Sequence, residues 1–98
     1  MSDELAISLR HTPERSRYEA LVDDLRAEAV YERVGDTLIF THVGVPPAIE
    51  GRGVGGRLVQ FALDDVRANG WRAVPRCPFV RAWLGDHPNY ADLIDSSS

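Results

Sequence analysis

Lysine is absent from this 98-residue sequence, and all eleven of its basic residues are arginine. A GC-rich coding sequence is the simplest origin of that bias. Cysteine is nearly absent as well: a single residue, Cys77, excludes an internal disulfide bond and suits a reducing compartment. No stretch approaches the roughly 20 apolar residues of a membrane span. The opening residues, MSDELAISLR, carry acids where a signal peptide carries basic residues. We therefore expect a cytoplasmic protein with no membrane partner.

The charge balance argues against nucleic acid as a partner. The formal net charge is −4, whereas binding to nucleic-acid phosphates needs clustered cations. A cationic partner fits this balance better. The length predicts one domain, 1–98, with 1–4 and 95–98 frayed. The hydrophobic fraction of 44% is enough for a core.

The first half of the chain has the two-residue period of β-strands. Extended segments are expected at 5–9, 17–22, 26–34 and 37–45. In the second and third of these, one face carries Tyr18, Ala20, Val22, Ala27, Ala29 and Tyr31. Turns are expected at HTPE (11–14), at Asp23-Asp24 and at Gly35-Asp36. Because 37–45 is apolar on both faces, it is typical of a central strand. The pattern predicts an antiparallel meander.

The period changes to that of a helix after Val54, and Asn69-Gly70 ends the helix. A short strand is expected at 71–77, where Pro75 suits an edge strand or a bulge. Short helical segments follow at 78–86, with Pro78 in the first turn, and at 87–94. The sequence therefore predicts an α+β fold in which one long helix packs on a mixed, mostly antiparallel sheet.

The stretch EGRGVGGRL, 50–58, lies between the last meander strand and the long helix. The first N–H groups of a helix have no partner within the helix. Glycines at that point let an anion approach the backbone, and the helix dipole favours negative charge. We interpret this loop as a phosphate-binding site. The alternative is a flexible loop that merely begins a helix.

Two familiar phosphate loops do not fit the stretch. A P-loop needs Lys-Ser or Lys-Thr after its last glycine, whereas Gly56 is followed by Arg57-Leu58. Gly51, Gly53 and Gly56 formally match the dinucleotide-binding pattern G-x-G-x-x-G. The preceding strand, however, belongs to a meander, and the chain has no room for a doubly wound sheet.

The whole arrangement resembles the GNAT superfamily of acyl-CoA-dependent N-acetyltransferases. The superfamily pattern is [Gln/Arg]-x-x-Gly-x-[Gly/Ala], and EGRGVG (50–55) fills that position here. Together with CPFV (77–80) and HPNY (87–90), it looks like the small single-domain group of GNAT-like proteins, over about 17–94. The resemblance implies acetyl transfer from acetyl-CoA to a primary amine, small or peptidic, by direct attack and without a metal, in a monomer or weak homodimer. The alternatives are a CoA- or acyl-CoA-binding module with little catalysis, and a scaffold with a vestigial loop.

The resemblance also implies the residues that bind the coenzyme. Backbone groups of the strand before the loop hold its pantetheine arm, and the loop holds its pyrophosphate. The implied set is Val43, Gly44, Val45, Glu50, Gly51, Arg52, Gly53, Val54, Gly55, Gly56 and Arg57. Glu50 departs from the superfamily pattern, which has Gln or Arg at this position. An acid near a pyrophosphate would repel it. Either Glu50 points away, or Arg52 and Arg57 offset its charge.

Two residues are candidates for catalysis. Cys77 precedes Pro78 at a helix start, where a thiol can become more acidic, and the resemblance places it near the acetyl group. It is a nucleophile, a base, a positioning group or a small buried residue. Histidine is a common general base at neutral pH, so His42 is a candidate for that role, or it is a hydrogen-bonded structural residue. Other side chains are interpreted as structural or carry no signal, namely His11, Trp71, Trp83, His87 and Tyr90.

Overall fold

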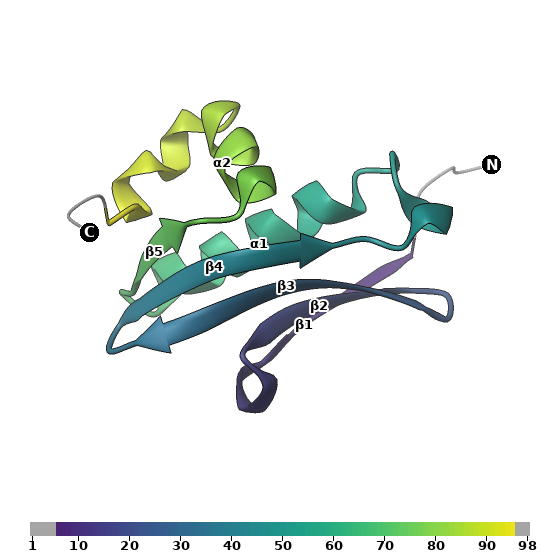
Figure 1. Cartoon of the computed structure of the whole chain (residues 1–98), viewed down its shortest axis with the longest axis horizontal. Helices are drawn as coiled ribbons and strands as arrows, with labels where there is room; N and C mark the ends of the chain where they lie inside the picture. The colour runs from purple at the N-terminus through teal and green to yellow at the C-terminus, as the bar shows by residue number, and fades with distance from the viewer. Residues whose placement is uncertain (1–5, 96–98) are drawn as a thin grey trace.

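The computed structural model describes residues 6–95, and these form a five-stranded sheet in the order β1-β2-β3-β4-β5 (Figure 1). The first four strands are antiparallel, and β5 pairs parallel to β4. Their bounds are Ile7–Thr12 (β1), Arg17–Val22 (β2), Leu25–Val34 (β3), Thr37–Gly44 (β4) and Arg72–Pro75 (β5). The predicted mixed, mostly antiparallel sheet with an N-terminal meander is confirmed.

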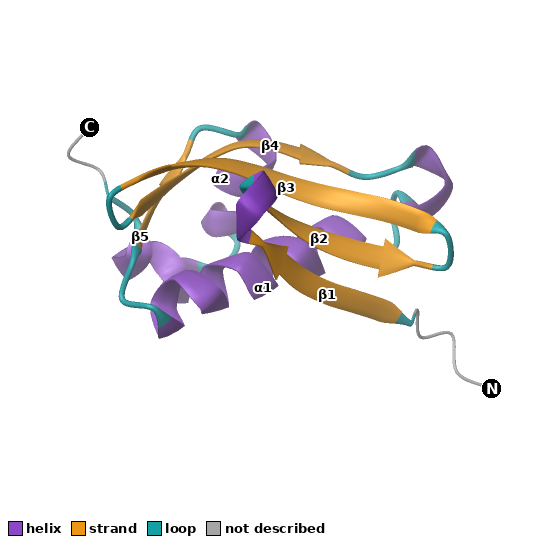
Figure 2. Ribbon diagram, turned by 90° about the horizontal axis from the view of Figure 1, so that it is seen from below, coloured by secondary structure: helices purple, strands orange, loops and turns teal. Residues whose placement is uncertain are grey.

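The long helix α1 and the shorter helix α2 pack on the same face of this sheet (Figure 2). Their bounds are Val54–Ala68 (α1) and Pro78–Gly85 (α2), and three 3-10 turns lie at Pro13–Arg15, Pro47–Ile49 and Pro88–Leu93. The predicted helix start at Val54 is confirmed, as is the C-terminal cap at Asn69. Pro75 lies in an edge strand, as its missing N–H predicts.

The first strand continues further than the sequence predicts. His11 and Thr12, expected in a turn, are the last residues of β1 and pair with Tyr18 and Arg17 of β2. The reason is that the cross-strand ladder satisfies their backbone groups, and the chain turns only where Pro13 fixes φ. Of the ends expected to be frayed, residues 1–4 and 96–98 lie outside the described residues. Asp95 is described, and its N–H donates to the carbonyl of Ala73 at 2.9 Å.

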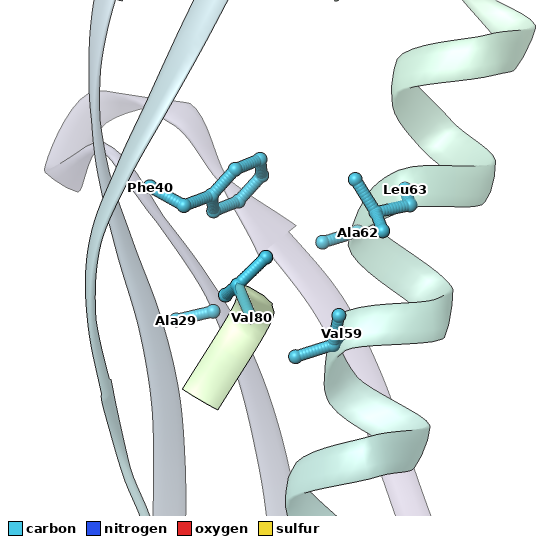
Figure 3. A pocket seen from close by; sticks show the side chains of 6 residues that line it. All are labelled: Ala29, Phe40, Val59, Ala62, Leu63 and Val80. Atoms are coloured by element: carbon cyan, nitrogen blue, oxygen red, sulfur yellow. The ribbon is translucent and has the colours of Figure 1, made fainter. Parts of the chain in front are cut away.

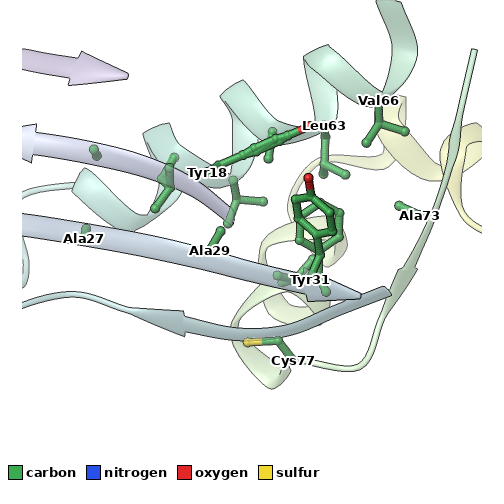
Figure 4. Close-up of a cluster of buried hydrophobic side chains, with 14 of the residues drawn as sticks. Tyr18, Ala27, Ala29, Tyr31, Leu63, Val66, Ala73 and Cys77 are labelled. Carbon is green, nitrogen blue, oxygen red and sulfur yellow. The ribbon is translucent and has the colours of Figure 1, made fainter. Parts of the chain in front are cut away.

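The core lies between the sheet and α1. The inward set predicted from alternation is buried: Tyr18, Ala20, Val22, Ala27, Ala29 and Tyr31. Aromatic and aliphatic side chains of β2, β3 and β4 meet the buried face of α1 (Figure 4). Val80 of α2 closes a gap between Phe40 and α1 that is too small for a water molecule (Figure 3). This packing fixes α1, and with it the glycine-rich loop, relative to β4.

A bulge interrupts β4 beside its junction with β5. Tyr31 pairs with Phe40 while Val30 pairs with His42, so Thr41 is the extra residue. On the other side, β4 pairs with β5 only over Thr37–Phe40. Within residues 6–95 no strand pairs with the β5 side of β4 beyond this point. The two strands therefore diverge and leave a backbone edge open next to the loop.

Candidate functional site

A cavity of about 360 Å³ lies between the end of β4, the glycine-rich loop and the start of α1. It is lined by Val43, Val45, Ile49, Glu50, Gly51, Gly53, Val54, Gly55, Gly56 and Phe79. Most of the residues predicted to bind a coenzyme thus surround one cavity. Gly44, Arg52 and Arg57 are not among its lining residues. The cavity combines an apolar part, made by valines, Ile49 and Phe79, with a part made of glycine backbone.

The loop backbone presents free N–H groups to this cavity. Gly51 and Gly53 both have φ of +80°, and a Cβ on either would meet no protein atom within 4 Å. Gly53 caps α1, no side chain bonds to the helix start, and the first intrahelical bond runs from Arg57 N to Gly53 O at 3.0 Å. The N–H groups of residues 54–56 therefore precede the helical ladder. An anion can approach them past Gly51 and Gly53, beside which the space is open.

The other two glycines of the loop face side chains of α2. A Cβ on Gly55 would lie 2.6 Å from the ring of Phe79, and one on Gly56 would lie 3.4 Å from the indole nitrogen of Trp83. Phe79 and Trp83 are four residues apart in α2, so both rings lie on one helix face. This face packs on the first turn of α1. Sequence reasoning missed Phe79, although its spacing from Trp83 was a readable signal.

The open edge of β4 supplies a second set of backbone groups. The N–H of Tyr31 donates to Ser16 O on the β2 side, and backbone groups of alternate strand residues face opposite sides. Val30 therefore faces β4 and pairs with His42. His42 therefore directs its backbone groups toward β3. Val43, which follows His42 in β4, directs its backbone N–H and C=O away from β3, toward the side where β5 has ended. A donor and an acceptor are thus available beside the apolar part of the cavity.

His42 lies on the opposite face of β4 from the side chain of Val43. It is exposed and does not line the cavity. Its ring covers Gly44, because a Cβ placed there would lie 2.9 Å from the His42 Nε2 atom. The lack of a side chain at Gly44 leaves room for the imidazole in this position.

Cys77 caps the start of α2 and is only 5% exposed. Its N–H donates to Phe40 O at 2.9 Å, at the point where β4 and β5 diverge. The side chain belongs to the buried cluster (Figure 4) and does not line the cavity. The structure therefore places Cys77 beside the junction of the two strands, with its thiol in apolar surroundings.

A second polar cluster, which the sequence did not indicate, lies further along α1. His11 Nε2 is 2.6 Å from the Tyr31 hydroxyl, and His11 Nδ1 is 3.4 Å from Asp65. The Tyr18 hydroxyl donates to the same carboxylate at 2.7 Å. Burial, more than any charge, lowers the pKa of His11, and burial together with Asp65 raises the pKa of Tyr18. These groups tie the end of β1 to the core.

His87 and Tyr90 also have structural partners. The His87 ring stacks on Trp83 at 3.7 Å, and its Nδ1 donates to the Trp83 carbonyl oxygen at 2.7 Å. The Tyr90 hydroxyl donates to Asp64 of α1 at 2.7 Å. Among residues 6–95, no three His, Cys, Asp or Glu side chains are close enough to hold a metal ion. No helix in the same range is long and apolar enough to span a bilayer.

Three features of the fold are those expected of an N-acetyltransferase domain. They are the meander, the strand β5 that diverges from β4 after Phe40, and the glycine loop that opens α1. Residues 17–93 match the family described as GCN5-related N-acetyl-transferase. The chain belongs to this family, as the sequence resemblance predicted.

Curated relatives are similar over much of the chain. Protein NATD1 of Mus musculus is 28% identical over 85 residues, which cover 84% of this chain and 77% of the mouse protein. Protein NATD1 of Homo sapiens is 33% identical over 64 residues, which cover 64% of this chain and 57% of the human protein.

A solved structure shows the same fold. It is the NMR solution structure of a GCN5-like protein from Staphylococcus aureus, described as a candidate N-acetyltransferase. The TM-score is 0.68 at 23% identity, and the match covers 99% of this chain and 94% of the other. The predicted α+β fold is therefore found in a second protein.

Proposed function

We propose that the protein transfers an acetyl group from acetyl-CoA to a primary amine, which attacks the thioester directly. The observation that carries this proposal is the single cavity that joins the free N–H groups of residues 54–56 to the open edge of β4 at Val43. A phosphate-bearing, partly apolar ligand fits both of its parts. The open space above Gly51 and Gly53, which a Cβ would enter, supports the same ligand.

The chain's own groups would act as follows. The backbone N–H groups of residues 54–56 would bind the pyrophosphate. Val43 and Val45 would contact the pantetheine arm, and the backbone of Val43 would hydrogen-bond to it. Acetyl-CoA supplies the acetyl group as an activated thioester. Backbone donors on the open edge of β4 would stabilise the oxyanion that develops on the carbonyl, which is a large catalytic term.

The sequence offers Cys77 and His42 as candidates for proton transfer or positioning, and neither lines the cavity. Because Cys77 is buried at the strand junction and is absent from the cavity lining, we favour direct attack by the amine, with Cys77 in a positioning role, over a covalent role. If Cys77 carried the acetyl group, acetyl-CoA alone would label it in a hydroxylamine-sensitive form, and Cys77→Ala would abolish activity. Direct attack predicts that Cys77→Ala retains CoA binding and loses at most a modest factor. Cys77→Ser separates size from thiolate chemistry.

Nothing in the sequence names the acceptor, and what we propose about it and the surroundings rests on composition and charge. We propose a small or peptidic primary amine as acceptor, a cytoplasmic location, and a monomer or weak homodimer without nucleic-acid, membrane or metal partners. The net negative charge of −4 favours a cationic acceptor. A CoA-binding module with little catalysis is the alternative, and only turnover distinguishes it.

The test is binding followed by turnover. In a Trp71→Phe background, Trp83 is the remaining tryptophan, and its packing on Gly56 places it next to the cavity. Addition of CoA should change its fluorescence, and Gly53→Val should abolish that response while the protein stays folded. Release of free CoA from acetyl-CoA in the presence of an amine would then identify an enzyme. Wild-type binding by a folded Gly53→Val protein would refute the assigned site.

A further inference from the structure

The cavity has one charged residue in its lining, and this residue is an acid, Glu50. Glu50 follows the buried Ile49, and its N–H bonds to Pro47 O at 3.3 Å. Gly51, with φ of +80°, turns the chain immediately after it. The turn and the buried neighbour therefore hold the backbone of Glu50 at the cavity, and its side chain is exposed.

The two loop arginines form no ion pair with Glu50. Arg52 and Arg57 are exposed and are absent from the cavity lining. Among residues 6–95, the ion pairs involve neither arginine and do not involve Glu50. The first turn of α1 contains no acidic residue. An anion at the helix start therefore encounters favourable backbone N–H groups and, in the lining of the same cavity, the exposed residue Glu50, whose carboxylate forms no ion pair within residues 6–95.

We infer that Glu50 is a specificity-determining residue that weakens binding of the anionic, nucleotide part of the coenzyme and leaves binding of its uncharged pantetheine arm unaffected. This inference rests on the proposed function. For an assumed separation of about 6 Å and an effective dielectric constant of about 40, repulsion between two like charges weakens binding about tenfold. The apolar part of the cavity then contributes most of the specific contact. Weak retention of the nucleotide part favours release of spent coenzyme.

The experiment compares two ligands and two matched variants. CoA and pantetheine are titrated calorimetrically at low salt into the wild type, Glu50→Gln and Glu32→Gln. Glu32 is exposed on β3, so its variant changes the net charge equally without altering the cavity. Glu50→Gln should tighten CoA binding about tenfold and pantetheine binding less than twofold, and Glu32→Gln should change neither. High salt should reduce the CoA effect.

The outcomes distinguish a failure of the role inferred for Glu50 from a failure of the proposed function. Equal CoA affinity in the wild type and Glu50→Gln would overturn the inference and leave the proposed function standing. A weaker affinity in Glu50→Gln would overturn it too, because the carboxylate would then be a binding group. An equal gain for pantetheine would show an effect on shape rather than charge. Failure of CoA to bind any of the proteins would overturn the proposed function together with the inference.

Discussion

The packing of Phe79 on Gly55 allows a prediction whose sign depends on a second residue. Gly55 is the second residue of α1 and is buried, and the Phe79 ring lies where its side chain would be. Alanine there brings a Cβ to 2.6 Å from the ring, closer than real carbon contacts. The ring is 43% exposed, so it can move away, but only by giving up its contact with α1.

Two opposing terms determine the stability of Gly55→Ala. Replacing glycine by alanine in a helix stabilises it by about 0.5–1 kcal/mol. Forcing an extra methyl group into a packed contact costs about 1–3 kcal/mol. The net expectation is a loss of between about 0 and 2.5 kcal/mol. In a Phe79→Ala background the contact is absent, so the same substitution should stabilise the protein by up to about 1 kcal/mol.

Urea unfolding of the wild type, both single variants and the double variant measures this coupling. Gly56→Ala is the control. Its Cβ would lie at 3.4 Å from Trp83, which is an ordinary contact, so this variant should retain most of the helix-propensity gain. The reasoning is refuted if Gly55→Ala has the same effect with and without Phe79. It is also refuted if Gly56→Ala destabilises the protein more than Gly55→Ala does.

Two further predictions concern proton binding and acetylation. Because burial lowers the pKa of His11 below 6.5, the unfolded chain binds this proton at higher pH than the folded one. The contribution of His11 to stability is therefore fully present above pH 6.5 and falls as the pH drops toward its folded pKa. The difference in unfolding free energy between wild type and His11→Gln should fall over the same pH range. A difference that does not change with pH would contradict this prediction. Since the sequence contains no lysine, incubation with acetyl-CoA should modify at most the N-terminus and Cys77, and a stable acetyl group elsewhere in the mass spectrum would contradict this.

Local patterns predicted the elements because their causes are local. Alternation identified the inward faces of β2 and β3, and helical spacing with Asn69-Gly70 bounded α1. The extension of β1 through His11 depends on Tyr18, Tyr31 and Asp65, which lie 7 to 54 positions away in sequence. No periodicity encodes such a contact. The sequence therefore left His11 without a role, and only the folded chain shows one.

The candidate site likewise has features that local sequence predicts and features that depend on contacts between distant residues. The glycine cluster at a helix start was visible, and most of its residues surround one cavity. The bulge at Thr41 and the end of β4–β5 pairing were not visible, because they depend on register between strands. The side of β4 that His42 occupies follows from the same register. A motif can indicate which residues are near a ligand, but the pairing of strands decides which groups face it.

The glycines of the loop show why a motif match does not by itself assign roles. Gly51 and Gly53 have positive φ and open space beside them, so their identity concerns backbone conformation and access to the cavity. Gly55 is in a helix that would favour alanine, so its identity concerns Phe79. A binding defect caused by Gly55→Ala should therefore be relieved by a smaller residue at 79. A defect caused by Gly53→Val should persist, because no side chain of α2 contacts that position. One loop thus combines two independent constraints, backbone conformation at Gly51 and Gly53 and packing at Gly55. Only the packing constraint can be relieved by a substitution in another element, at Phe79 in α2.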